Sequence, residues 1–198
     1  MPLTTSKVKT PLGMQTLDFW PITAENANSH PTYGAAVNLG AAVKGYLTVT
    51  TATASIVGDD AEQLFDEFFT SGQLDSETTM SDLQVNATLF GHSFSEENGE
   101  ESKSSDSAAL GGISFIEPIL LRDKGKVYRA TCLRKASAIA SSEKQEADTR
   151  KPGELNPKNN PVSFKVMEDN MGSWRVRKDF DSYDTAYAFV KKTFGAAT

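Results

Sequence analysis

The side chains of this 198-residue chain that could do chemistry are few and scattered. His30 and His92 are its only histidines, and neither has a second histidine or a cysteine at the spacing of a zinc site. Cys132 is the single cysteine, so no internal disulfide can form, and its place in an alternating pattern predicts a buried strand residue. We expect no catalytic, cofactor-binding or metal-binding residues.

Acidic pairs are the next candidates, because carboxylates can bind cations. They occur at Asp59–Asp60, Glu96–Glu97 and Glu100–Glu101. The alternating oxygen ligands and fixed glycine of a calcium loop are absent, and blocks of like charge usually lie in water. No Gly-x-Ser-x-Gly elbow or phosphate-binding loop occurs. A spatially assembled Ser-His-Asp triad, and hence a small hydrolase, stays open as the weakest alternative.

Aromatic residues gather in two segments and could line a ligand pocket. Their spacing is explained more simply by core-facing sides of helices or strands, so we expect them to be buried. They are Phe65, Phe68 and Phe69 in the first segment, and Tyr183, Tyr187 and Phe189 in the second.

The net charge and the lengths of the apolar runs limit the classes of partner that this protein is expected to bind. The net charge is -6 and the isoelectric point about 5.0, which argues against tight binding of nucleic acid through phosphates. No apolar run approaches the ~20 residues of a membrane span, and the N-terminus lacks the apolar core of a signal peptide. We expect synthesis in a reducing cytoplasm and no membrane partner.

Turn-forming residues divide the chain. Residues 1–32 are rich in proline and glycine around one apolar island, Leu17–Trp20, which predicts an extended N-terminal arm with a single strand. That arm packs on its own domain or reaches a neighbour. Residues 33–198 are expected to form a single domain, with polar, core-free surface loops at 95–109 and 141–160.

Alternation of apolar and polar residues predicts antiparallel strands. One half-buried strand is expected within 35–58, and another pair at 110–121 and 127–140 joined by a turn at 123–126. In that pair, Val127 and Leu133 face one way, and Ala130 and Cys132 the other. Residues 161–167 and 173–180 are expected to pair as a hairpin, with Trp174 and Val176 on one face.

Helical spacing predicts two helices. The first spans Ser81–Phe90, with Ser81 as its cap and Gly91 as its stop, and the second spans Ser182–Phe194 behind Asp181 or Ser182. Gln63–Phe69 fits either a helix or a strand by periodicity. The fold class is therefore mainly β (α+β).

The order of these features resembles the major tail, or tail tube, proteins of long non-contractile-tailed bacteriophages (siphophages) of Gram-positive hosts. The resemblance covers residues 33–194 and rests on an ordered set of short matches. They are Tyr33-Gly34, Leu39-Gly40 with a threonine-rich strand, Asp59-Asp60, Leu89-Phe90-Gly91-His92, Gly111–Phe115, Tyr128–Thr131, Leu133–Lys135, Ser163-Phe164 and Gly172–Phe180.

The resemblance implies an antiparallel β-sandwich or barrel of the tail tube type, with one packed helix and a C-terminal amphipathic helix. It favours extended chain at Gln63–Phe69. It also implies hexameric rings stacked into the virion tail, through which DNA is ejected without specific binding. The implied partners are other copies of the chain, the tape measure protein, and tail tip and terminator proteins; no catalytic residues are implied.

An acidic lumen would let phosphates pass without retention. The acids expected to face it are Asp66, Glu67, Asp75, Glu77 and Asp82. The alternative function is a carbohydrate- or protein-binding β-sandwich module of a virion or cell surface, which the long polar loops also fit.

Overall fold

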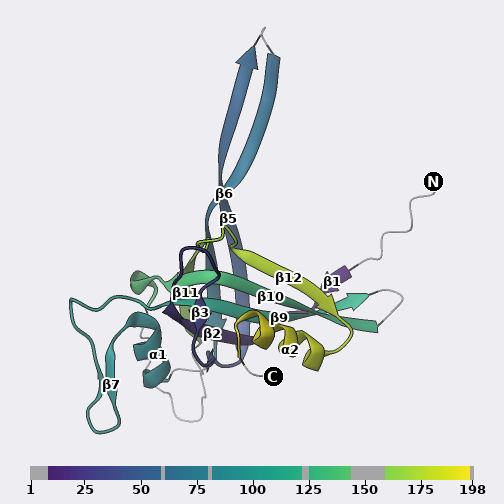
Figure 1. The fold of residues 1–198 in the computed structure, drawn as a ribbon. Coiled ribbons are helices and arrows are strands. Elements are labelled where there is room, and N and C mark those ends of the chain that lie inside the picture. The colour runs from purple at the N-terminus through teal and green to yellow at the C-terminus, as the bar shows by residue number, and fades with distance from the viewer. Residues whose placement is uncertain (1–8, 59–60, 80–81, 122–124, 144–158, 197–198) are drawn as a thin grey trace, which may run out of the picture.

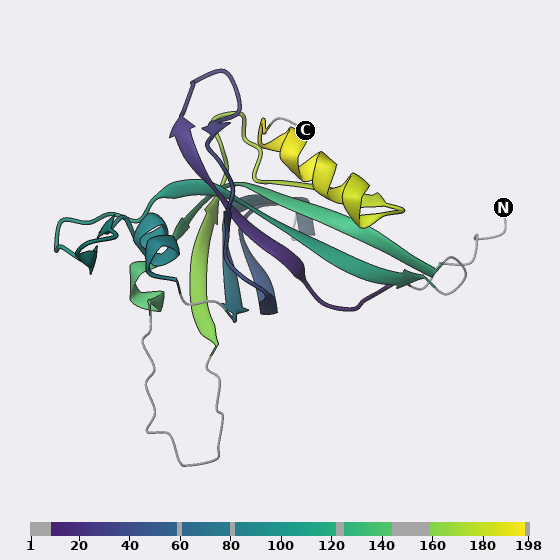
Figure 2. The same cartoon turned by 90° about the horizontal axis from the view of Figure 1, so that it is seen from below.

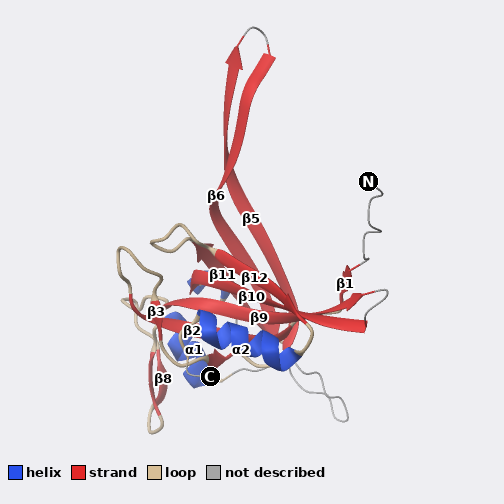
Figure 3. Cartoon of the chain, turned by 45° about the vertical axis from the view of Figure 1, so that its right-hand side comes forward, coloured by secondary structure: helices blue, strands red, loops and turns tan. Residues whose placement is uncertain are grey.

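The computed structural model describes residues 9–58, 61–79, 82–121, 125–143 and 159–196, and most of them lie in antiparallel strands (Figures 1 and 3). The mainly β prediction is thereby confirmed. The strands are β1 Lys9–Pro11, β2 Gln15–Ala24, β3 Thr32–Tyr33, β4 Val37–Asn38, β5 Ala42–Gly58, β6 Ala61–Thr78, β7 Ser93–Ser95, β8 Gly99–Glu101, β9 Leu110–Leu121, β10 Gly125–Ala138, β11 Asn160–Met167 and β12 Arg175–Phe180. The helices are α1 Leu83–Phe90, the 3-10 turn η1 Ala140–Ser142, and α2 Tyr183–Thr193.

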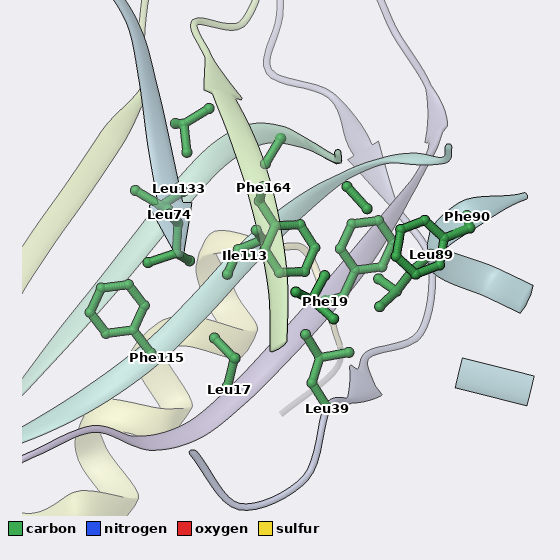
Figure 4. Packing of buried hydrophobic residues seen from close by; sticks show 14 residues of the cluster. Leu17, Phe19, Leu39, Leu74, Leu89, Phe90, Ile113, Phe115, Leu133 and Phe164 are labelled. Atoms are coloured by element: carbon green, nitrogen blue, oxygen red, sulfur yellow. The ribbon is translucent and has the colours of Figure 1, made fainter. Parts of the chain in front are cut away.

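Ten of the strands form one sheet, whose main path runs β3-β2-β9-β10-β11-β6-β5. The sheet curls over on itself. Phe19 of β2 and Phe164 of β11 stack with ring centroids 6.3 Å apart, although two strands separate them along the path. Both are fully buried, together with Leu74 of β6 and Ile113 of β9 (Figure 4). The curl therefore encloses the main core.

Helix α2 covers the opposite face of the central strands (Figure 2). Its buried Ala186 and Val190 pack with Ala130 and Cys132 of β10, as the alternation in β10 predicts. Phe194, just past the helix, stacks on Trp20 with centroids 5.0 Å apart. Strands β2, β9 and β10 are thus buried on both faces, which makes them the rigid centre of the molecule.

The N-terminal strand belongs to this centre. β2 pairs with β9 from Gln15↔Ile116 to Pro21↔Gly111, and Leu17 and Phe19 are fully buried. Of the two possibilities for the predicted arm, packing on its own domain is the one observed for residues 15–24. Residues 1–8 lie outside the described residues.

The predicted hairpin of residues 161–167 and 173–180 is wrong. β11 pairs with β10 at residues 135–138 and β12 pairs with it at 128–133, so both run in the same direction along one edge of β10. A register shift in β10 between Leu133 and Ala136 marks the place where the two partners change. Trp174 packs in the main core and Val176 under α2, so they do not share a face.

Both predicted helices are confirmed, with one change of cap. Asp82 caps α1 by accepting hydrogen bonds from the backbone N–H groups of Gln84 and Val85, and Gly91 ends it at a φ of 76°. The predicted cap, Ser81, lies outside the described residues. Ser182 caps α2, as predicted. Within the described chain, no helix has the length and apolar character needed to cross a membrane.

The two segments predicted to be polar loops differ in how much regular secondary structure the described residues contain. Residues 95–109 are not wholly loop, because β7 and β8 pair there as a separate two-stranded sheet, from Ser93↔Glu101 to Ser95↔Gly99. The loop at 141–160 begins with the end of η1 and finishes at the start of β11. Its residues 144–158 lie outside the described residues.

Candidate functional site

The most prominent feature of the surface is the long hairpin of β5 and β6, which projects far beyond the rest of the sheet (Figures 1 and 3). β11 supports β6 only as far as the pair Val166↔Gly72. Beyond that point β5 and β6 pair with each other alone among the described strands. We call residues 50–58 and 61–71 the distal hairpin; the side chains of 55–64 are not described.

The extended state of Gln63–Phe69 agrees with the expectation taken from the resemblance, since these residues lie within β6. The expected burial of the aromatic residues is wrong there. Phe65 and Phe68 are 60% and 52% exposed. The half-buried strand predicted within 35–58 is also largely exposed, with Leu47 as its main inward-packing side chain.

Strand register divides the distal hairpin into two faces, because directly paired residues point to the same side. Phe68 pairs with Ala52 and lies on one face, whereas Phe65 pairs with Ser55 and lies on the other. Beyond the root of the hairpin, an apolar side chain is therefore exposed on each of its two faces.

The edges of the distal hairpin are as open as its faces. No described strand pairs with the outer edge of β5, or with the second edge of β6 between Ala61 and Ser71. Long exposed edges offer unpaired N–H and C=O groups to another strand. An isolated two-stranded hairpin is also only marginally stable in water. Both facts point to a partner that adds strands or covers the faces.

An aromatic stack sets the direction of the hairpin at its root. Phe69 stacks on Trp174 with centroids 4.4 Å apart and planes 3° from parallel. The guanidinium carbon of Arg175 lies 4.2 Å from the centroid of the Trp174 ring, and the Trp174 carbonyl accepts a hydrogen bond from the N–H of Arg134. The root is thus fixed to β10 through the loop between β11 and β12.

The acids predicted to face a lumen do not all share a face. Lys44, Tyr46 and every second β5 residue as far as Ala54 pair with one set of β6 residues: Glu77, Asp75, Gln73, Ser71, Phe68 and Asp66. We call this side of β5 and β6 the acidic face. It holds three of the five acids, Asp66, Asp75 and Glu77. Lys44 is the cation described on this face, and its Nζ lies 3.9 Å from Oε1 of Glu77.

Asp75 is held in place on this face. The Ser163 hydroxyl and the Gln73 amide donate hydrogen bonds to its Oδ1 at 2.6 and 2.8 Å. These bonds, the Ser163 bond above all, lower the pKa of Asp75 below its usual value. The carboxylate therefore stays charged at neutral pH.

The other two acids lie elsewhere. Glu67 pairs with Thr53 on the opposite face of the hairpin and accepts a hydrogen bond from the Thr51 hydroxyl. Asp82 is on no strand, because it caps α1. The expectation that all five acids lie on strand faces is wrong for Asp82. The charge pattern of the sequence alone cannot distinguish an acid on the acidic face, an acid on the opposite face and an acid that caps a helix.

The two histidines each lie beside a carboxylate. His30 Nδ1 is 2.6 Å from Oδ2 of Asp169, a buried residue that turns the chain between β11 and β12. Burial raises the pKa of Asp169, but hydrogen bonds from His30 and from the N–H groups of Ser173 and Met171 together hold it below its usual value. His30 therefore fastens the N-terminal region to this turn.

Cys132 and His92 have different surroundings. The Cys132 thiol is fully buried under α2, and burial raises its pKa to about 12, so it is not a reactive nucleophile. His92 Nδ1 lies 2.7 Å from Oε1 of Glu100 and 3.1 Å from the Ser102 hydroxyl. Glu143 is also near, although it is distant along the chain. Spacing in the sequence could not reveal that approach.

Comparison with known proteins adds no relative: a scan against family models finds no match, and a search of the curated proteins finds none either.

Proposed function

We propose that this protein is a structural subunit that polymerises through its distal hairpin, forming the hexameric rings of a bacteriophage tail tube. The observation that carries the proposal is the hairpin itself, with open edges and an exposed phenylalanine on each face. The ordered resemblance to siphophage tail tube proteins supplies the kind of assembly. The sheet body, buried on both faces at its centre, supplies a rigid mount for the hairpin.

Assembly by strand pairing would satisfy the hairpin in two ways. A neighbouring copy's strand on the open second edge of β6, between Ala61 and Ser71, takes up its unpaired backbone groups. The same pairing places that strand's side chains beside Phe65 on one face and Phe68 on the other. Full burial of a phenylalanine contributes about 1.5–3 kcal/mol. Phe65, on the side away from the acidic face, can gain that burial, whereas Phe68 lies on the acidic face and gains partial cover from the neighbouring strand's side chains.

The acidic face is the proposed wall of the lumen. Asp66, Asp75 and Glu77 lie on it, interspersed with threonine and glutamine, and Lys44 is a single described cation among them. DNA phosphates are repelled by such a surface, so the genome can slide without being retained. Tape measure protein within the tube, and tip and terminator proteins at its ends, complete the proposed virion tail.

The assembly proposal is tested by replacing both exposed aromatics. Wild-type protein at high concentration should form rings or tubes in negative-stain images and a large species in analytical ultracentrifugation. The variant Phe65→Ser with Phe68→Ser should remain monomeric with an unchanged melting midpoint. Met171→Ser is the matched control, because Met171 is 53% exposed on a turn outside the hairpin and its loss should leave assembly intact.

Two outcomes would count against the proposal. Assembly of the double variant at wild-type concentration would remove the hairpin from the interface. A wild-type chain that stays monomeric at every concentration, and that is retained on an immobilised glycan or protein, would favour the alternative β-sandwich binding module.

The lumen proposal needs a separate test, in assembled particles. Asp66→Lys with Glu77→Lys should leave tubes intact while DNA ejection slows, more strongly at low salt, where screening is weak. The matched control is Glu67→Lys with Glu96→Lys, which changes the net charge equally but away from the acidic face. Equal slowing by both pairs would mean that net charge, and not this face, governs passage.

A further inference from the structure

We propose that His92, Glu100 and Glu143 form a zinc site that fastens the small β7–β8 sheet to the end of η1. The three residues come from three separate pieces of the chain. His92 follows the end of α1, Glu100 is on β8, and Glu143 directly follows η1. This inference stands apart from tube assembly, since none of the three lies on the β5–β6 hairpin.

The geometry of the cluster is already close to that of a metal centre. One potential ligand atom from each residue lies within 4.8 Å of the other two. The His92 and Glu100 side chains are only 9% and 13% exposed and lie 2.7 Å apart. Ligand atoms about 2.1 Å from a tetrahedral zinc are about 3.4 Å from one another, so zinc would replace the hydrogen bond between Nδ1 of His92 and Oε1 of Glu100 and move these atoms apart by about 0.7 Å. Glu143 is exposed, so its carboxylate can close the remaining distance by rotating.

The donor set favours zinc over the other common divalent cations. One imidazole nitrogen and two carboxylate oxygens are normal zinc ligands, and a site with three protein ligands completes its shell with water. An open depression lined by Leu83, Glu100, Ser102 and Glu143 leaves room for that water. Calcium requires six to eight oxygen ligands, and magnesium keeps most of its own water, so an imidazole suits neither.

Charge supplies a second argument. The carboxylates of Glu100 and Glu143 lie close together, and one zinc ion would offset the charge of both. The contact with His92 accounts for the position of Glu100, whereas no ion pair with a described residue accounts for the position of the Glu143 carboxylate.

A metal ion at this cluster would link two parts of the fold that no described strand pairing joins. β7 and β8 form a two-stranded sheet with no ladder to the described strands of the main sheet, and such a sheet is marginally stable alone. η1 follows directly on β10, so it is attached to the rigid centre. Zinc between Glu100 and Glu143 would join the small sheet to that centre.

The test is a titration of metal-stripped protein with Zn²⁺ by calorimetry, together with Co²⁺ absorption, whose visible bands report tetrahedral coordination. We expect one saturable equivalent per chain and a raised melting midpoint when zinc is present. Glu143→Gln and His92→Gln should each weaken binding at least tenfold. Glu143 is exposed, so its variant is expected to fold even if the His92 variant does not.

The matched controls are Glu96→Gln and Glu101→Gln. Each removes one acidic charge from the β7–β8 segment without changing a residue of the proposed zinc site. Both should bind zinc as the wild type does. The proposal is overturned if no saturable binding is found, if the Glu143 variant binds as tightly as wild type, or if the control variants lose as much affinity.

Discussion

The sheet body and the distal hairpin share strands β5 and β6, but the two regions lie in opposite environments. In the body, Leu74 of β6 is fully buried and β11 pairs along the strand's second edge. A few residues earlier in β6, Phe68 is 52% exposed and that edge is open. The body has the buried contacts that a domain needs to stand alone, whereas the distal hairpin exposes apolar side chains and open strand edges.

This contrast separates stability from assembly. Side chains in the body should decide whether the monomer folds, and side chains on the distal hairpin should decide what the folded monomer does. The four substitutions below test that division in descending order of their expected effect on the free energy of unfolding.

Phe164→Ala should have the largest effect. The ring is fully buried, stacks on Phe19 and lies where the sheet curls, so its removal leaves a cavity between non-adjacent strands. The expected loss in the free energy of unfolding is about 3–5 kcal/mol, measured by urea denaturation. A loss below about 1 kcal/mol would mean that the curled sheet is not held together at this contact.

Asp169→Ala should cost about 2–3 kcal/mol, because it removes the acceptor for the N–H groups of Met171 and Ser173 and leaves them unpaired. The folded pKa of Asp169 is lowered, so its contribution is present above the unfolded pKa and is lost as the pH falls through the folded value. Denaturation from about pH 7 down to about pH 2 should therefore show a shallower acid decline in Asp169→Asn than in wild type. An identical decline would contradict the charged role of Asp169.

Asp82→Ala should cost about 1 kcal/mol through the loss of the α1 cap. The same loss is expected for Ser182→Ala at α2, which serves as the comparison. If Asp82 instead belonged to a lumen wall, its replacement would alter DNA passage and leave the melting midpoint unchanged. Thermal denaturation of the two variants distinguishes these outcomes.

Phe68→Ala should have the smallest effect on the monomer, within about 0.5 kcal/mol, because its ring is largely in water. The same change should shift self-association to higher concentration, as measured by sedimentation. A marked loss of monomer stability would show that the distal hairpin packs on its own body, and the comparison between the two regions would fail.

Local pattern predicted the strands and helices well, because alternation and caps are short-range signals. β10 shows this: Ala130 and Cys132 lie under α2 and Leu133 lies in the main core, as their alternation indicates. At Gln63–Phe69 the spacing of the apolar residues fits a helix or a strand equally well, and the structure shows a strand because the segment pairs with β5. The resemblance, and not the residues' spacing, anticipated that result.

The failures come from long-range pairing. The turn residues between β11 and β12 are compatible both with a hairpin and with the observed loop. The observed arrangement follows from pairing with a third strand, because β11 and β12 both pair with the same edge of β10. Exposure of Phe65 and Phe68 could not be predicted, because an apolar strand has the same pattern whether its partner is in the chain or in another copy. The approach of Glu143 to His92 likewise depends on where β10 ends relative to α1.

The insertion of β2 beside β9 has a consequence for folding during synthesis. Trp20 and Ser114, which share a hydrogen bond in the finished protein, are 94 residues apart. At a translation rate of about 5–20 residues per second, the ribosome needs about 5–20 s to supply β9 after β2 has emerged. β5 and β6 are adjacent and can pair within about 1–10 μs. The nascent chain therefore presents its open hairpin for seconds before its core can close, and we expect the charges of Asp66 and Glu67, between Phe65 and Phe68, to oppose aggregation in that interval.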